Sequence, residues 1–345
     1  ACQIDTARVK ITVNAKPTIG LTATKNICNT SNTLDLLSLL NGTPESGGIW
    51  KSTSIAQAGL PQGQANLNGL AAGVYDFYYQ KPIVGCPKDS VLLRINLKKQ
   101  VSPGSDLVKE ICEGTPAFKL FTLLAASTDT SGIWIDSNPT GKLSIDGTLA
   151  SFNLPASNYN FTYFISGSSI CADTSAKLSL TIKPAPTPFI NPLNAKVCMD
   201  SLVQIQLNFA GVGPFSSILS TSQFDKTYSF TASSVQYDTT LSSNTQFVIR
   251  DLIDHGNGCR ALKTADTVIT VYQPLEAILL EENCDGDLNT FSVKIAIEGG
   301  DSSSYRVNNI PINGTTYTLT GVQNGDNYTL DFTDDTQCST SSIKE

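Results

Sequence analysis

The run Gly73-Val74-Tyr75-Asp76-Phe77-Tyr78-Tyr79 returns as Ser157-Asn158-Tyr159-Asn160-Phe161-Thr162-Tyr163, with its aromatic residues in register. A shorter motif, Ser46-Gly47-Gly48-Ile49-Trp50, returns at the same spacing as Thr130-Ser131-Gly132-Ile133-Trp134. Alternation of aromatic or β-branched residues with polar ones is typical of half-buried strands. The two motifs therefore predict a chain built from repeated β-units.

The cysteines follow the same period. They form one leading residue and four pairs: Cys2, then Cys28 and Cys86, Cys112 and Cys171, Cys198 and Cys259, Cys284 and Cys338. The members of a pair are roughly 60 residues apart and first members recur roughly every 85 residues, which is the size of an immunoglobulin-like β-sandwich. We expect one disulfide within each repeat, joining the two members of each pair. We expect Cys2 to be the second cysteine of a preceding repeat, with its partner outside this sequence.

Metal binding is the alternative role for nine cysteines. The sequence has no Cys-x-x-Cys motif and a single histidine, so it lacks the ligand sets of zinc sites. Closing a loop of this length stabilises a domain by roughly 3–4 kcal/mol. Disulfides also indicate an oxidising compartment such as the periplasm, the cell surface or the exterior.

Fold class and domain boundaries follow from the repeat. We expect an all-β chain of tandem immunoglobulin-like sandwiches, arranged as an extended rod because prolines mark short, stiff linkers. The predicted ranges are 1–17 for the last strand of a truncated preceding domain, 18–100, 101–186 and 187–275 for three immunoglobulin-like domains, and 276–345 for an immunoglobulin-like or fibronectin-like fourth. The chain would then be a segment of a larger protein, and the N-terminal residues contain no signal peptide.

The sequence also predicts the secondary structure of individual segments. Alternating runs predict the last strand of each sandwich at Val91–Leu97, Ala176–Ile182 and Val268–Tyr272, and the equivalent strand of the preceding domain at Ala7–Val13. The leucine-rich segments 34–40 and 118–126 fit either a helical turn or an early strand, and we favour strand or irregular structure for both.

Four aromatic residues invite a functional explanation. Trp50 and Trp134 are suited to stacking on sugars, but a core tryptophan is the commoner role in sandwiches of this kind, and we expect that role. Tyr75 and Tyr159 each follow a turn and precede the second cysteine of their repeat at nearly the same spacing. We expect them to act like the tyrosine corner of immunoglobulin domains rather than to bind a ligand.

Composition excludes several classes of function. The net charge of −7, with charged residues at only 15%, argues against nucleic-acid binding. No apolar run is long enough to cross a bilayer as a helix, so we expect no membrane span. His255 lies in a turn-like segment and no catalytic motif is present, so we expect no enzyme activity and no cofactor. The segment 285–289 and the pair Asp334-Asp335 resemble calcium loops weakly, and we predict no metal site.

The motifs, taken together, resemble the repeats of Bacteroidetes surface proteins, in particular the SprB-type gliding adhesins and their PKD-like or immunoglobulin-like relatives. The resemblance implies export by type IX secretion, display on the outer surface and association with the outer membrane. It also implies O-glycosylation at Asp-Ser/Thr followed by a small or aliphatic residue, which marks Thr6, Ser90 and Thr267, with Thr174 departing from the pattern. The alternative is that Asp-Ser/Thr simply begins the last strand.

Three functions fit these features. The first is a stalk or filament segment of a large cell-surface adhesin, used in gliding motility or surface attachment. Its partners would be surface polysaccharide or other cell-surface or substratum ligands, together with further repeats of the parent chain. The second is a module whose loops bind a carbohydrate or protein. The third is a non-catalytic arm of a secreted hydrolase. We favour the first, and the choice rests on family resemblance rather than on fold.

Overall fold

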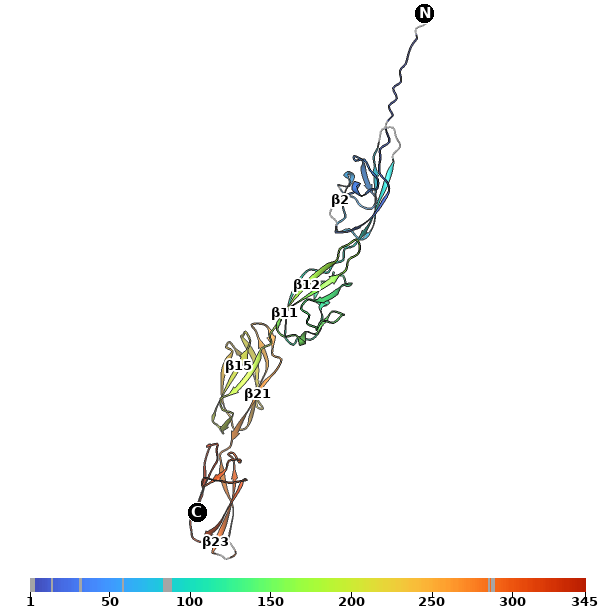
Figure 1. Cartoon of the computed structure of the whole chain (residues 1–345). Coiled ribbons are helices and arrows are strands. Elements are labelled where there is room, and N and C mark those ends of the chain that lie inside the picture. The colour runs from blue at the N-terminus through green and yellow to red at the C-terminus, as the bar shows by residue number, and fades with distance from the viewer. Residues whose placement is uncertain are drawn as a thin grey trace. The chain divides into compact units, whose positions relative to one another are not determined.

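The computed structural model describes residues 4–13, 15–30, 33–57, 59–82, 89–284, 286 and 289–345. In this part of the chain the regular structure consists of strands β1–β28 and the single-turn 3₁₀ helices η1–η4, which confirms the all-β class (Figure 1). None of the helices among these residues is long and apolar enough to cross a bilayer. We use repeats 1 to 4 as names for the predicted ranges 18–100, 101–186, 187–275 and 276–345, whose boundaries stay a prediction.

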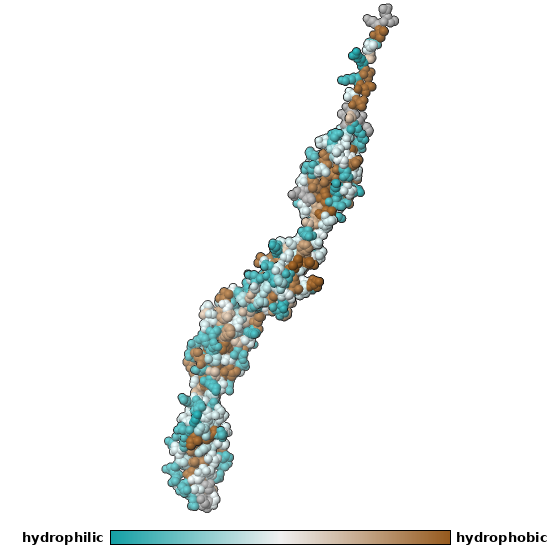
Figure 2. All heavy atoms as spheres, viewed as in Figure 1, coloured by the Kyte–Doolittle hydropathy of each residue, from teal (hydrophilic) through white to brown (hydrophobic). Residues whose placement is uncertain are grey.

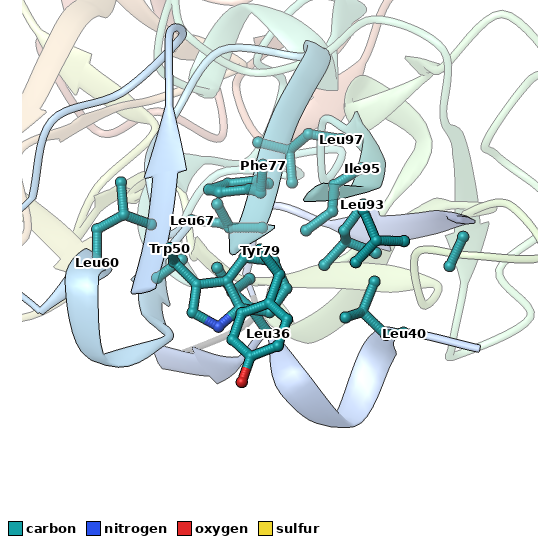
Figure 3. Packing of buried hydrophobic residues seen from close by; sticks show 13 residues of the cluster. Leu36, Leu40, Trp50, Leu60, Leu67, Phe77, Tyr79, Leu93, Ile95 and Leu97 are labelled. Atoms are coloured by element: carbon teal, nitrogen blue, oxygen red, sulfur yellow. The ribbon is translucent and has the colours of Figure 1, made fainter. Parts of the chain in front are cut away.

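Repeat 1 packs two sheets around an apolar core. One sheet has the order β1-β6-β5-β3 and the other pairs β2 with β4. The first and last strands run parallel, which sets Cys28 opposite Lys98. Trp50, Phe77 and Tyr79 pack with leucines from both sheets (Figure 3). Its elements are β1 (Ala23–Cys28), β2 (Thr33–Asp35), η1 (Leu37–Leu39), β3 (Ile49–Ser52), η2 (Leu60–Gln62), β4 (Gln64–Asn66), β5 (Gly73–Gln80) and β6 (Ser90–Lys98).

Repeat 2 has the same order of elements. One sheet runs β7-β12-β11-β9 and the other pairs β10 with β8, and β11 and β12 are labelled in Figure 1. Every second residue of β12 is buried, as the predicted alternation requires. Its elements are β7 (Leu107–Cys112), β8 (Phe118–Lys119), η3 (Leu120–Leu123), β9 (Ile133–Asp136), β10 (Thr148–Leu149), η4 (Ser151–Asn153), β11 (Ser157–Ile165) and β12 (Thr174–Lys183).

Repeat 3 has more strands than repeats 1 and 2, in two sheets of three and six strands. One has the order β13-β15-β18, and the other has the order β14-β21-β19-β16-β17 with β20 on β19. The parallel pairing of β14 with β21 sets Cys198 opposite Tyr272. Its core takes phenylalanines from both sheets, Phe209 and Phe215 among them. Its elements are β13 (Thr187–Pro192), β14 (Lys196–Cys198), β15 (Leu202–Ala210), β16 (Phe215–Ser220), β17 (Asp225–Phe230), β18 (Ser234–Thr240), β19 (Thr245–Asp254), β20 (Cys259–Arg260) and β21 (Ala265–Tyr272).

Repeat 4 is a smaller sandwich. Its sheets have the orders β22-β23-β26 and β25-β24-β27-β28. Val293, Ile295 and Ile297 of β23 meet Leu330 and Phe332 of β27 in the core. Its elements are β22 (Glu276–Cys284), β23 (Thr290–Glu298), β24 (Arg306–Val307), β25 (Ile310–Pro311), β26 (Thr316–Gln323), β27 (Thr329–Thr333) and β28 (Ser341–Lys344).

Most strand predictions are confirmed, and one is wrong. The runs 91–97, 176–182 and 268–272 lie in β6, β12 and β21. Segments 34–40 and 118–126 each begin with a short strand and continue into one 3₁₀ turn. Residues 7–13 form no strand, and the side chains of Val9, Ile11 and Val13 are fully exposed to solvent. A strand needs hydrogen-bonding neighbours, and no described residue pairs with this segment (Figure 2).

Candidate functional sites at the repeat junctions and at Trp134

In repeats 2 and 3 the two cysteines lie at opposite ends of the last strand. In repeats 1 to 3 the residue after the first cysteine donates its backbone N–H to the end of the last strand: Asn29 to Lys98, Glu113 to Lys183 and Met199 to Tyr272, at 2.9 Å each. In contrast, Cys171 precedes β12, and Cys259 precedes β21. The strand β12 spans about 30 Å at ~3.3 Å per residue. The first cysteine therefore lies beside the linker to the next repeat, and the second lies at the far end.

The predicted pairing within each repeat is wrong. The disulfides are Cys28–Cys171, Cys112–Cys259 and Cys198–Cys338, with sequence separations of 143, 147 and 140 residues. A disulfide needs Cα atoms within about 7 Å, and the length of the last strand separates the two cysteines of one repeat. The first cysteines of repeats 1 to 3 instead bond to the second cysteine of the following repeat. Cys284 is exposed and unbonded among the described residues, while Cys2 and Cys86 lie outside them.

Hydrogen bonds surround the disulfide between repeats 1 and 2. The Gln100 side chain donates Nε2–H to the carbonyl of Ala172 (2.8 Å). The Asp129 carboxylate accepts the Ser102 N–H (2.7 Å) and pairs with Lys99 (3.2 Å). These contacts, the Ser102 bond first, lower the pKa of Asp129 below its usual range. The linker after β6 is thus held to repeat 2 by polar contacts as well as by the disulfide.

The junction between repeats 2 and 3 combines apolar and polar contacts. A Cβ atom at Gly114 would lie 2.3 Å from Leu262 Cδ2, so the backbone here packs directly on that leucine. Asn257 donates its Nδ2–H to the carbonyl of Pro184 (3.0 Å). The Glu113 carboxylate accepts N–H groups from Ala156 (2.8 Å) and Ala185 (3.0 Å). These groups surround the Cys112–Cys259 bond.

Close backbone packing marks the junction between repeats 3 and 4. A Cβ atom at Gly299 would lie 1.9 Å from the Pro274 carbonyl oxygen, so only glycine fits there. Tyr272 donates its hydroxyl to Asp301 (3.3 Å), and Lys196 lies 5.9 Å from the Tyr272 ring centroid. These residues line a hollow of about 300 Å³ beside Cys198–Cys338.

The Gly-Ile-Trp motif has a structural explanation. The Tyr79 hydroxyl accepts the Gly48 N–H (2.9 Å), and the Tyr163 hydroxyl accepts the Gly132 N–H (3.0 Å). A Cβ atom would lie 2.4 Å from Tyr79 Cζ at Gly48 and 2.7 Å from Tyr163 Cζ at Gly132. Glycine is required because the tyrosine ring lies against its backbone. The last tyrosine of each aromatic run thus fixes the turn before the tryptophan, a role that the sequence pattern did not predict.

The two tryptophans differ in their surroundings. Trp50 is 3% exposed, which confirms its core role, and Leu60 of η2 packs beside it (Figure 3). Ser144 follows Trp134 at the spacing at which Leu60 follows Trp50. Trp134 is only half-buried and lines a hollow of about 320 Å³. The core prediction for Trp134 therefore needs correction. The position that matches Leu60 in the sequence is the small, polar Ser144.

The rim of this hollow is apolar on one side and charged on the other. Ile133 and Ile145 are exposed, and Figure 2 shows hydrophobic atoms gathered on the surface of repeat 2. Lys119 and Asp146 form an ion pair (3.7 Å) at its edge. Hydrogen bonds from Ser144 and Thr148 lower the pKa of Asp146 to about 2. An aromatic floor with polar groups at its edge is the composition of small-ligand sites.

Other predicted site residues have ordinary surroundings. Tyr75 donates its hydroxyl to the carbonyl of Ala71 (2.9 Å), as a tyrosine corner does. His255 lies in an exposed turn, with its Nε2 atom 2.8 Å from the Ser216 hydroxyl. Asp334 is buried, and its carboxylate accepts N–H groups from Asp301 and Thr336.

The structure also places the predicted calcium and glycan positions. The described residues contain no group of three or more potential metal ligands, and most of the segment 285–289 lies outside them. Thr6 and Ser90 are exposed, whereas Thr267 is half-buried within β21. Ser90 and Thr174 are the first residues of β6 and β12. Asp-Ser/Thr therefore begins the last strand in repeats 1 and 2, and glycosylation stays a prediction.

Comparison with known proteins gives structural neighbours alone. The sequence matches no family model and no curated protein. Similar solved structures include an I-band fragment of titin, 12% identical, covering 71% of this chain and 95% of that chain, with a TM-score of 0.32. They also include N-cadherin from Drosophila (13%, 94% and 99%, 0.27) and the first four immunoglobulin domains of Sidekick-1 (12%, 96% and 96%, 0.27). The assignment of tandem immunoglobulin-like sandwiches rests on the strand pairing and the buried cores.

Proposed function

We propose that the chain is a non-catalytic structural segment, a stalk or filament, of a large cell-surface adhesin used in attachment or gliding motility. The disulfides support a secreted or extracellular protein, since such bonds persist in oxidising compartments. The observation that carries the proposal is that each disulfide joins successive repeats rather than closing one of them. Bonds of that kind link neighbouring repeats covalently, as suits a protein whose function is to form a long array of repeats.

The finer parts of the proposal come from the resemblance to SprB-type adhesin repeats. They are type IX secretion, association with the outer membrane, an extended rod of repeats and O-glycans on Thr6, Ser90 and Thr267. The partners would be surface polysaccharide or other cell-surface or substratum ligands and further repeats of the parent chain. Intact mass of the protein from its native source tests the glycans, which would add to the mass of the sequence.

The location and size of the native protein test the proposal as a whole. An antibody against this segment would be applied to intact cells and to reducing gels. We expect surface labelling and a protease-sensitive band far above 36.8 kDa. A band near that mass, or antigen confined inside the cell, would overturn the stalk proposal.

The hollow at Trp134 favours a second candidate function, the binding of a carbohydrate. Sugar rings stack on aromatic faces, and Trp134 lies in an open hollow with Lys119 and Asp146 at the rim. The matching tryptophan of repeat 1 is covered. If both functions hold, repeat 2 would be the part of the stalk that contacts polysaccharide.

Tryptophan fluorescence tests this candidate, because the chain has only two tryptophans. The Trp50→Phe variant retains Trp134 as its sole reporter and should show a saturable change with polysaccharide extracts. The Trp134→Phe variant is the matched control and should show none. Equal responses from the two variants, or no response from either, would exclude binding at this hollow.

A further inference from the structure

Two of the three disulfides create a covalent path along the chain that is far shorter than the backbone. From Cys28 the path crosses to Cys171, follows the backbone from Cys171 to Cys198 and then crosses to Cys338. The backbone route from Cys28 to Cys338 instead passes through nearly the whole of all four repeats. We propose that this path is a line of tension, so that a pull along the chain bypasses the backbone from Cys28 to Cys171 and from Cys198 to Cys338 and cannot extend those two segments.

The lengths of the two routes set the size of the effect. A fully extended chain spans at most about 3.6 Å per residue. The segment from Cys171 to Cys198, about 27 residues, can therefore reach about 97 Å. The backbone route from Cys28 to Cys338, about 310 residues, can reach about 1,100 Å. Each disulfide adds only its Cα–Cα distance, 5.2 Å and 5.3 Å. The disulfides thus reduce the reach of this region about tenfold.

Most residues of the segment from Cys171 to Cys198 lie in extended strands. These strands are β12, β13 and β14. Strands rise about 3.3 Å per residue, so complete straightening of these three strands would add only on the order of 10 Å. Loss of every hydrogen bond in the sheets would therefore release little length.

The remaining disulfide, Cys112–Cys259, lies outside this path. Cys112 and Cys259 lie within the two backbone segments that the path bypasses, so their bond carries no load while the other two disulfides are intact. When one of the other two disulfides is missing, the shortest covalent route along the chain passes through Cys112–Cys259. Without Cys198–Cys338, the shortest route between Cys28 and Cys338 runs back from Cys171 to Cys112 and forward from Cys259. That detour follows roughly 140 residues of backbone and can reach roughly 500 Å.

Single-molecule force spectroscopy on the whole chain, held by its two termini, tests this proposal. The oxidised chain should reach a contour length of about 230 Å, and full reduction after folding should raise it to about 1,240 Å. The Cys198→Ser variant should lengthen the oxidised chain by about 400 Å. The Cys112→Ser variant, which also removes one disulfide, should leave the contour length unchanged.

Two results would overturn the proposal. One is an oxidised chain that lengthens in steps of about 300 Å, the length of a whole unravelled repeat. The other is an equal lengthening in the Cys112→Ser and Cys198→Ser variants. Reduction of the wild-type chain inside the instrument keeps the test valid if a variant fails to fold. The outcome is independent of where the native protein resides, so it is distinguishable from failure of the adhesin proposal.

Discussion

Replacement of Gly48 by alanine should destabilise repeat 1 by more than its small size suggests. The new Cβ atom would lie 2.4 Å from Tyr79 Cζ and 2.6 Å from the Gln80 carbonyl oxygen. Carbon atoms at rest are about 3.5–4.0 Å apart, so the ring has to move by roughly 1 Å or more. Tyr79 is fully buried, with its ring centroid 5.0 Å from that of Trp50, and has no free space to enter.

The expected cost combines two terms. Overpacking a core costs about 1–3 kcal/mol, and loss of the hydrogen bond between the Gly48 N–H and the Tyr79 hydroxyl costs about 0.5–1.5 kcal/mol. We therefore expect Gly48→Ala to lower the free energy of unfolding of repeat 1 by about 2–4 kcal/mol. Substitution of Gly132 should act alike in repeat 2, because Tyr163 lies in the same place.

Denaturant unfolding, followed by fluorescence in a Trp134→Phe background, isolates repeat 1 because Trp50 is then the sole tryptophan. Gly73→Ala is the matched control, since its Cβ atom would meet only Tyr75 Cε2 at 3.9 Å, an ordinary contact. The reasoning is refuted if Gly48→Ala costs no more than Gly73→Ala.

Three further predictions concern other parts of the chain. Tyr75→Phe removes the hydroxyl bonded to Ala71 and should cost repeat 1 about 0.5–1.5 kcal/mol in the same fluorescence assay, and no change would exclude a tyrosine-corner role. Asp146 has a folded pKa of about 2, below its ordinary 3.8, so its carboxylate stabilises repeat 2 above about pH 4, and this stabilisation is lost as the pH falls through 2. Asp146→Asn should therefore destabilise the Trp50→Phe protein at pH 7 and much less at pH 2, and an equal effect at both would contradict this. A protease site inserted between Pro103 and Gly104 should give fragments that separate on gels after reduction alone, because Cys28–Cys171 spans the cut; release without reductant would disprove the bond.

The strands were predictable, but the partners of the cysteines were not. Alternation in 91–97 and 176–182 reports burial directly, because each sheet has one face on the core. The spacing of the cysteines does not show which of them are bonded. In a periodic array, pairing within a repeat and pairing with the next repeat both give bonds that recur with the same period. The choice depends on the ends of the strands, and the parallel pairing of Cys28 with Lys98 is a tertiary feature without a local signal.

One difference between the environments of Trp50 and Trp134 could be predicted from the sequence. Alignment of repeats 1 and 2 on their tryptophans sets Ser144 against Leu60, so repeat 2 has a small polar residue where repeat 1 has a leucine. What the sequence does not show is that η2 brings Leu60 against Trp50, because a single 3₁₀ turn has no periodicity of its own. The contact of Tyr79 with Gly48 likewise joins residues that are distant in the sequence.

Disulfide mapping of the native protein tests the central claim most directly. Peptides would be prepared without reduction, with free thiols blocked, and identified by mass spectrometry. We predict cross-linked peptides that contain Cys28 with Cys171, Cys112 with Cys259, and Cys198 with Cys338. Peptides that join Cys112 to Cys171, or Cys198 to Cys259, would show that each disulfide closes its own repeat and would contradict both the covalent continuity of the array and the line of tension.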